Sequence, residues 1–122
     1  MAASSADQPR TAFKILSAEE WKDWETSTSF KGASIDLADG YIHLSTAAQS
    51  AETYAKYFAG QPNLVLAEVD LELLGDAVKW EESRGGQLFP HVYGPIPLSA
   101  VLRVREDVGD EVMEGLASKG LL

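Results

Sequence analysis

The 122-residue sequence contains no cysteine, and this absence excludes several chemistries at once. Disulfide bonds, thiolate nucleophiles and cysteine-ligated zinc all need a thiol. Histidine is scarce as well, because His43 and His91 are the only two, and no His-x-His or His-x-x-x-His spacing of a metal site exists. A Gly-x-Ser-x-Gly pattern for an activated serine is also missing. Neither a metal site nor a serine triad is therefore expected.

Basic residues are few, with 10 lysines and arginines against 19 acidic residues and a net charge of −9. A surface that binds duplex nucleic acid needs clustered lysine and arginine to displace counterions from phosphates. Here the basic residues are scattered, so general nucleic-acid binding is not expected. Net charge says little about a single cleft, and a few local donors can still hold a small anionic ligand.

Long apolar runs are missing too. None approaches the roughly 18–20 residues of a membrane-spanning helix, so no transmembrane segment is expected. Residues 1–11 are rich in alanine and serine and lack the apolar core of a signal peptide, which predicts a disordered tail. Residues 12–122 are expected to form one domain. The absence of cysteine fits a cytoplasmic protein, and nothing in the sequence specifies an oligomeric state.

What the chain does contain is a clear order of helix and strand signals. Ser17 and Glu20 have capping-box spacing for a helix over 18–26, in which Trp21 and Trp24 are expected to be core residues. Thr46 and Gln49 have the same spacing, and predict a helix that ends near Gly60. Strands are predicted over 12–16, 41–44, 64–70, 77–81, 88–93 and 100–105, a third helix over 110–119, and connections or turns over 27–36, 71–75 and 94–97.

This order favours an α+β fold with a largely antiparallel sheet and two or three helices, because the helices are segregated and the later connections have hairpin length. The strand over 64–70 is apolar enough to be central. Pro90 limits the strand over 88–93 to an edge or a break, since proline cannot donate to a ladder.

His43 lies in the segment Asp39–Thr46, where Asp-Gly predicts a turn and Tyr41, His43 and Ser45 share one face of a strand. The following helix start offers free backbone N–H groups, and the hydroxyls of Ser45 and Thr46 lie beside them. Such a helix N-terminus can hold phosphate or carboxylate. The alternatives are a buried structural histidine and hydroxyls that only cap the helix.

His91 shares a strand face with Phe89 and Tyr93, and Pro90 and the turn over 94–97 frame it rigidly. Its side chain is either aimed into a site or merely lies where prolines end an edge strand. We expect the segments of His43 and His91 to lie side by side and form one site. Arg84, followed by two glycines, can close over an anion, although a surface ion pair with the preceding glutamates is the simpler explanation.

Four segments together resemble the family called domain of unknown function 952 (DUF952), over about Ala12 to Arg105. They are Phe13–Leu16 with its tryptophan-bearing helix, Asp39–Thr46, Trp80-Glu81 and Leu88–Ile96. The family has no established activity. Its fold is similar to the ADP-ribosyltransferase group, which binds NAD in the cleft of a split antiparallel sheet and includes RNA 2′-phosphotransferases.

The resemblance implies a split sheet in this chain and a polar residue on each of three cleft strands, at Lys14, His43 and His91. The glutamate that this group uses on the ribose 2′-OH is missing from the His91 segment. Histidine- and arginine-based phosphate transfer, or nucleotide binding, is therefore favoured over protein ADP-ribosylation.

The leading hypothesis is an enzyme that acts on a nucleotide-like anionic substrate, with NAD as a candidate co-substrate. His43 and His91 are its predicted catalytic residues. The residues predicted to bind substrate are Lys14, Ser45, Thr46, Arg84 and Tyr93. Two alternatives stay open, a non-catalytic module that binds a small metabolite and a structural role for both histidines.

Overall fold

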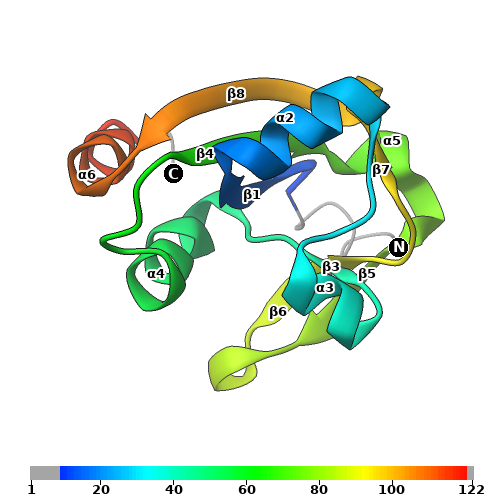
Figure 1. Ribbon diagram of the computed structural model, residues 1–122. Coiled ribbons are helices and arrows are strands. Elements are labelled where there is room, and N and C mark those ends of the chain that lie inside the picture. Colours follow the sequence, from blue (N-terminus) through cyan, green and yellow to red (C-terminus); the bar gives the residue numbers. More distant parts are fainter. Residues whose placement is uncertain (1–8, 121–122) are drawn as a thin grey trace.

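The computed structural model of the protein describes residues 9–120, apart from the side chain of Arg84 (Figure 1). All strand pairs in this part of the chain are antiparallel. One sheet has the order β1-β4-β8, a second has the order β3-β6-β5, and β2 pairs with β7. The strands are β1 (Thr11–Ser17), β2 (Ser29–Phe30), β3 (Ile42–His43), β4 (Leu64–Asp70), β5 (Val78–Glu82), β6 (Leu88–Val92), β7 (Ile96–Pro97) and β8 (Val101–Val108).

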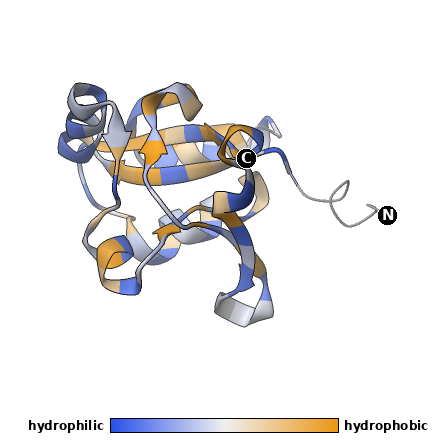
Figure 2. Ribbon diagram, turned by 90° about the vertical axis from the view of Figure 1, so that its right-hand side faces the viewer, coloured by the Kyte–Doolittle hydropathy of each residue, from blue (hydrophilic) through white to orange (hydrophobic). Residues whose placement is uncertain are grey.

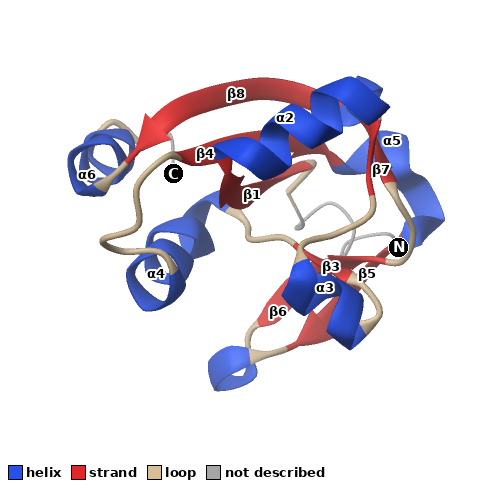
Figure 3. Cartoon of the chain, in the orientation of Figure 1, coloured by secondary structure: helices blue, strands red, loops and turns tan. Residues whose placement is uncertain are grey.

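Helices lie on the outside of these sheets (Figure 3). The described residues contain five α-helices: α2 (Ala18–Ser27), α3 (Ser34–Asp39), α4 (Ala47–Tyr57), α5 (Leu71–Leu74) and α6 (Asp110–Ser118). Short 3₁₀ turns follow at Gly75–Ala77, Arg84–Gly86 and Leu98–Ala100. The α+β class with antiparallel sheets is confirmed, whereas the expected number of two or three helices is too low. None of the helices in residues 9–120 is long and apolar enough to cross a membrane.

The two helices missed by the sequence interpretation, α3 and α5, have only six and four residues. Helix α3 begins at Ser34, within the stretch 27–36 that was predicted to be a connection, and continues to Asp39. In its first turn the Asp36 carboxylate accepts from the Ala33 amide. At its other end, Gly40 ends the helix in the left-handed conformation with φ +86°. The Asp-Gly pair at 39–40 is therefore a helix end.

In the sheet β1-β4-β8, the strands β1 and β4 are buried on both faces, whereas β8 is mostly exposed. Ala12, Leu16 and Val65 belong to one apolar cluster, together with the tryptophans of α2. Phe13 and Ile15 belong to a second cluster with residues of α4 and α6. In Figure 2 the hydrophobic colour follows the strands inside the molecule. The prediction of β4 as a central strand and of a buried role for both tryptophans is confirmed.

The sheet β3-β6-β5 contradicts one of the two alternatives predicted for the strand of Pro90, an edge strand, because β6 is its middle strand. The Leu44 amide donates to the Pro90 carbonyl over 3.1 Å. In an antiparallel pair the opposite bond would come from the amide of residue 90, and proline has none. The β3–β6 ladder ends at His43, so the missing donor falls where pairing stops.

The segment after β3 joins the two sheets. Ser45 and Phe13 form an isolated antiparallel bridge, in which the Phe13 amide donates to the Ser45 carbonyl over 2.7 Å and the Ser45 amide donates back over 2.9 Å. Four consecutive residues, 42–45, thus pair first with β6 and then with β1. This junction fixes the side chains of β3 between the two sheets.

Both predicted capping boxes are present. The Glu20 carboxylate accepts from the Ser17 amide over 2.8 Å, and Gln49 accepts from the Thr46 amide over 3.0 Å. The turn predicted over 94–97 is wrong in its second half, because Ile96 and Pro97 pair with Phe30 and Ser29 as β7. Of the tail expected over 1–11, residues 1–8 lie outside the described part of the chain, and Thr11 already belongs to β1.

Candidate functional site

A cavity of about 350 Å³ lies where the two sheets meet α3 and α4. Both histidines contribute to its wall, together with side chains from β1, both helices and the segment between β3 and α4. The lining residues are Lys14, Ile15, Ile35, Asp39, Tyr41, His43, Leu44, Ser45, Thr53, Tyr57, Phe58, Ser83, Phe89 and His91. Its volume falls within the range of about 300–1,000 Å³ that is typical of small-molecule pockets.

The two histidines lie side by side, as the sequence predicts. His43 and His91 are register partners in the β3–β6 ladder, and their ring centroids are 5.4 Å apart. The Tyr41 ring stacks on His91 at 4.2 Å and lies 4.7 Å from His43. Two strands that are far apart in the sequence thus present one aromatic surface to the cavity.

Asp36 is the centre of the hydrogen-bond network on the His43 side. It is 1% exposed, and its carboxylate lies 2.9 and 3.1 Å from the Lys14 ammonium. The same carboxylate contacts Nδ1 of His43 at 2.6 Å and accepts from the His43 amide at 3.0 Å and from the Ala33 amide at 2.7 Å. Asp36 therefore ties α3 to β1 and β3.

Burial and hydrogen bonding shift the pKa of Asp36 in opposite directions. Burial raises it, but the hydrogen bond with the His43 ring, the charge of Lys14 and the His43 amide all lower it. The net result is a pKa lowered from its usual 3.8 to about 2. Asp36 is therefore ionised in the folded protein at neutral pH.

His43 is held at both ring nitrogens. Nδ1 contacts Asp36, and Nε2 lies 2.9 Å from a carboxylate oxygen of Asp39. Carboxylates only accept, and an imidazole can donate from both nitrogens only when both carry a proton. His43 therefore has no free nitrogen for a ligand unless Asp39 moves away.

His91 is held at one nitrogen. Its Nδ1 lies 2.8 Å from Oε1 of Glu81, and the same oxygen accepts from the Tyr93 hydroxyl at 2.8 Å. The hydrogen bonds from His91 and Tyr93 lower the pKa of Glu81, and the bond to Glu81 raises the pKa of Tyr93. Among the described residues, Nε2 of His91 has no hydrogen-bond partner. It is the ring nitrogen that remains available to a ligand.

The other predicted site residues are distributed around this cavity. Lys14 and Ser45 line it, and the Ser45 hydroxyl is 2.9 Å from that of Thr53. The Thr46 hydroxyl caps α4 and does not belong to the lining. Tyr93 is 44% exposed and contacts Glu81 and Tyr41. The side chain of Arg84 lies outside the described residues, so its role stays a prediction.

Sequence reasoning missed the three carboxylates that orient the histidines. Asp36 had no usable signal, because Ala33 at the N-cap lacks the hydroxyl of a capping box, although the Asp36 carboxylate does accept from the Ala33 amide. Glu81 could have been found from the hairpin of β5 and β6, whose register sets Glu81 opposite Phe89, next to the His91 pair. Asp39 was interpreted only as part of a turn.

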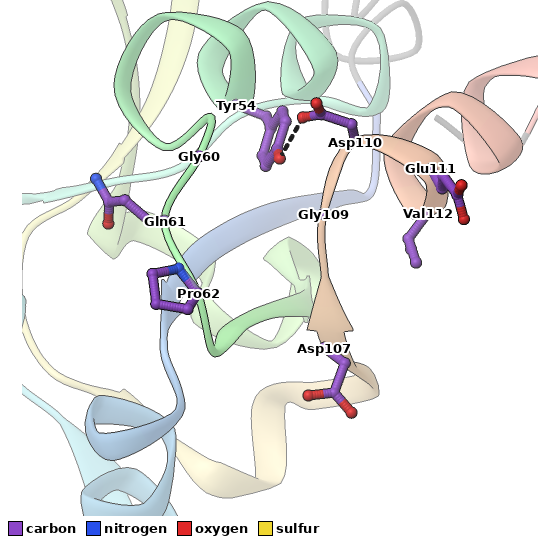
Figure 4. Close-up of a pocket in the computed structure, with 9 residues that line it drawn as sticks. All are labelled: Tyr54, Gly60, Gln61, Pro62, Asp107, Gly109, Asp110, Glu111 and Val112. Carbon is purple, nitrogen blue, oxygen red and sulfur yellow. Dashed lines mark hydrogen bonds between the residues drawn. The ribbon is translucent and has the colours of Figure 1, made fainter.

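A larger hollow of about 460 Å³ lies between α4 and the start of α6 (Figure 4). The Tyr54 hydroxyl donates to Asp110 there over 2.7 Å, and this bond raises the pKa of Tyr54. The carboxylates of Asp107, Asp110 and Glu111 point in different directions in Figure 4. Within residues 9–120, no three histidine or acidic side chains are grouped to hold a metal ion. This hollow offers no convergent chemistry, unlike the smaller cavity.

Three comparisons relate the chain to known proteins. The family model described as "Protein of unknown function (DUF952)" matches residues 15–104. Among curated proteins, none matches the chain.

Solved structures of a bacterial protein match both the fold and the sequence. The crystal structure of protein CC0527 from Caulobacter crescentus has a TM-score of 0.77 and 50% identity, covering 79% of this chain and 84% of that one. The solution NMR structure of CC0527 has a TM-score of 0.77 and 45% identity, covering 91% and 97% of the two chains.

Proposed function

The chain belongs to the DUF952 family of proteins of unknown function, and on that premise we propose that it is an enzyme with His91 as general base. Its substrate is a small nucleotide-like molecule that binds in the cavity between the two sheets. The observation that carries this proposal is the contact between Nδ1 of His91 and Glu81, which leaves Nε2 without a partner among the described residues.

A carboxylate that accepts from Nδ1 selects the tautomer with its proton on that nitrogen. The lone pair of Nε2 is then available to take a proton from a substrate or a water molecule. Enzymes that use histidine as a base commonly orient it through such a third group. Because His91 is nearly buried, with a side chain 4% exposed, its ring orientation is also fixed by packing.

The size of the cavity limits the substrate. At about 350 Å³ it lies near the lower end of the range for ligand pockets. A nucleoside-sized group fits such a volume, whereas a dinucleotide such as NAD would have only one part inside. NAD-linked ADP-ribosyl transfer and phosphate transfer are the reactions we propose to test first.

The contacts of His43 favour a positioning role over the direct catalytic role predicted from the sequence. Both of its nitrogens face carboxylates, and these contacts connect β3 with α3. Lys14 is engaged in the same way, since its ammonium lies against Asp36 and donates to the His43 carbonyl over 3.0 Å. A rigid wall of this kind also suits the second candidate function, a module that binds its ligand without turnover.

The test is to incubate the protein with NAD, ADP-ribose and a 2′-phosphorylated oligonucleotide, and to follow products by mass spectrometry. His91→Asn removes the base and is expected to lower turnover by about a hundredfold or more. His43→Asn is the matched control in the neighbouring strand, and is expected to retain a larger share of the activity. Turnover of His91→Asn at the wild-type rate would contradict the proposal, and binding of a ligand without turnover would favour the binding module.

A further inference from the structure

Among the described residues of the cavity wall, Lys14 and His43 can carry a positive charge, and both already have anionic partners. The Lys14 ammonium is 2.9 Å from one Asp36 oxygen and 3.1 Å from the other, and it also donates to the His43 carbonyl. His43 lies between two carboxylates, those of Asp36 and Asp39. A ligand phosphate would therefore compete with these carboxylates for both groups.

Apart from the buried Asp36, the negative charges near the cavity are more exposed than the Lys14 ammonium. The side chain of Asp39, which lines the cavity, is 44% exposed, whereas that of Lys14 is only 8% exposed. Glu81, behind His91, adds another carboxylate. The described ionisable groups around the cavity thus carry no net positive charge, even with His43 protonated. Transfer of a phosphate from water into this cavity would cost free energy, because a desolvated anion needs a cationic partner.

The rest of the wall is apolar and aromatic. Tyr41, Tyr57, Phe58 and Phe89 line the cavity together with aliphatic side chains. Ile35 and Tyr57 remain 61% and 55% exposed, although both belong to the lining. Aromatic and aliphatic side chains stabilise flat, uncharged rings by stacking and by burial of apolar area. At the polar side, Nε2 of His91 accepts hydrogen bonds and the Ser45 hydroxyl can donate or accept.

We propose that this cavity receives the uncharged, planar end of the ligand, a nucleobase-like heterocycle, and excludes the phosphate groups. The ring stacks against the aromatic wall, and an N–H at its edge faces Nε2 of His91, so that this N–H carries the proton that the proposed base would remove. The inference rests on the proposed function for the choice of a nucleotide-like ligand. It departs from the sequence-based expectation that His43, with the helix start beside it, and Arg84 hold the anionic part.

The direct test is an NMR titration of the full chain with the four ribonucleosides, their 5′-monophosphates and inorganic phosphate. At least one nucleoside is expected to shift the resonances of His91, Ser45 and Phe89. Its monophosphate is expected to bind within about threefold of the nucleoside, because an exposed phosphate gains little in water. Inorganic phosphate is expected to leave these resonances unchanged. The inference is overturned if no nucleoside binds, or if phosphate alone shifts the cavity resonances.

A pair of variants on α3 makes the test specific to the cavity wall. Ile35→Asp puts a carboxylate on the lining and is expected to weaken nucleoside binding by about tenfold, since it removes apolar contact area. Leu37→Asp is the matched control, because Leu37 lies on the same helix, is 65% exposed and does not line this cavity. Equal affinity of the two variants for the nucleoside would overturn the inference.

These measurements separate this inference from the proposed function. Nucleoside binding at His91 with no turnover of any nucleotide leaves the inference standing and overturns the enzyme. Conversely, His91-dependent turnover of a nucleotide whose phosphate shifts Lys14 and His43 supports the enzyme and overturns the inference.

Discussion

The two sides of the cavity hold their histidines in different ways. On the β3 side, His43 is 31% exposed and contacts carboxylates through both ring nitrogens. On the β6 side, the side chain of His91 is 4% exposed and contacts a carboxylate through Nδ1 alone. Both side chains line the same cavity, and their rings are 5.4 Å apart. The difference in their contacts therefore does not come from their distance to the cavity.

The difference shows that carboxylates, rather than the histidines themselves, assign the roles in this site. Two acceptors turn an imidazole into a connector between α3 and β3. One acceptor orients an imidazole and leaves its second nitrogen for chemistry. The buried histidine is therefore our candidate base, although the more exposed one would be more accessible to a ligand.

The largest effect on stability is expected from removing the carboxylate of Asp36, which contacts both Lys14 and His43. Asp36→Asn leaves the buried Lys14 ammonium without its ionic partner, and is expected to lower the free energy of unfolding by about 3–5 kcal/mol. Asp39→Asn is the control, and is expected to cost less than about 1 kcal/mol because Asp39 is partly solvated. Urea unfolding measures both. A loss below about 1 kcal/mol in Asp36→Asn would show that the network does not hold α3.

Acid is expected to lower the free energy of unfolding by an intermediate amount, because it protonates the same carboxylate, that of Asp36. The pKa of Asp36 is lowered from 3.8 to about 2, so its contribution is fully present above the unfolded value and is lost as pH falls through the folded value. At 1.36 kcal/mol per pKa unit, stability should fall by about 2 kcal/mol between roughly pH 4 and pH 2. Urea unfolding at a series of pH values measures this loss. Asp36→Asn should lack this part of the pH dependence, and an unchanged profile would contradict the assignment.

On the His91 side, we expect an effect on chemistry with little effect on stability. The side chain of Glu81 is 41% exposed, and Glu81→Gln replaces a pure acceptor with an amide that can donate to Nδ1. The tautomer of His91 should then shift toward Nε2–H, with a loss of about tenfold in turnover. Long-range ¹H–¹⁵N spectra identify the tautomer. The ¹⁵N shifts of His43 serve as the internal control, because its carboxylates are unchanged.

The smallest effect is expected from Tyr93→Phe. This change removes one of the two hydrogen bonds to Oε1 of Glu81 and leaves the His91 contact in place. Both hydrogen bonds lower the pKa of Glu81, so the variant should raise that pKa only partway to its usual value. NMR titration of the Glu81 carboxyl carbon measures the shift. A pKa that does not change would mean that Tyr93 does not contribute.

The elements that the sequence predicts well depend on local signals. Strands β1 and β4 alternate clearly between two apolar clusters, and both capping boxes are formed within three residues. The pairing of His43 with His91 was also predicted, because each lies in a short extended segment. The strands and the capping boxes need no knowledge of distant partners.

The rest of the site depends on contacts between residues far apart in the chain. Lys14 and Asp36 are separated by 22 positions, and no local pattern matches them. The strand of Pro90 was predicted to lie at an edge or to be broken, because proline cannot donate to a ladder. In the structure it is a middle strand, and its pairing with β3 ends beside Pro90. The two carboxylates that hold His43 come from α3, so they could not be identified until that helix was placed.

The bridge between Phe13 and Ser45 also makes the junction of the two sheets observable by amide exchange. Two backbone amides cross that junction, and each donates to the other residue. Residues next to both of them, Lys14 and Leu44, line the cavity. Local opening there would release both protons together, at a rate set by the stability of this junction and not by global unfolding. A molecule bound in the cavity should therefore slow exchange at these two amides, which would report occupancy without any assay of reaction.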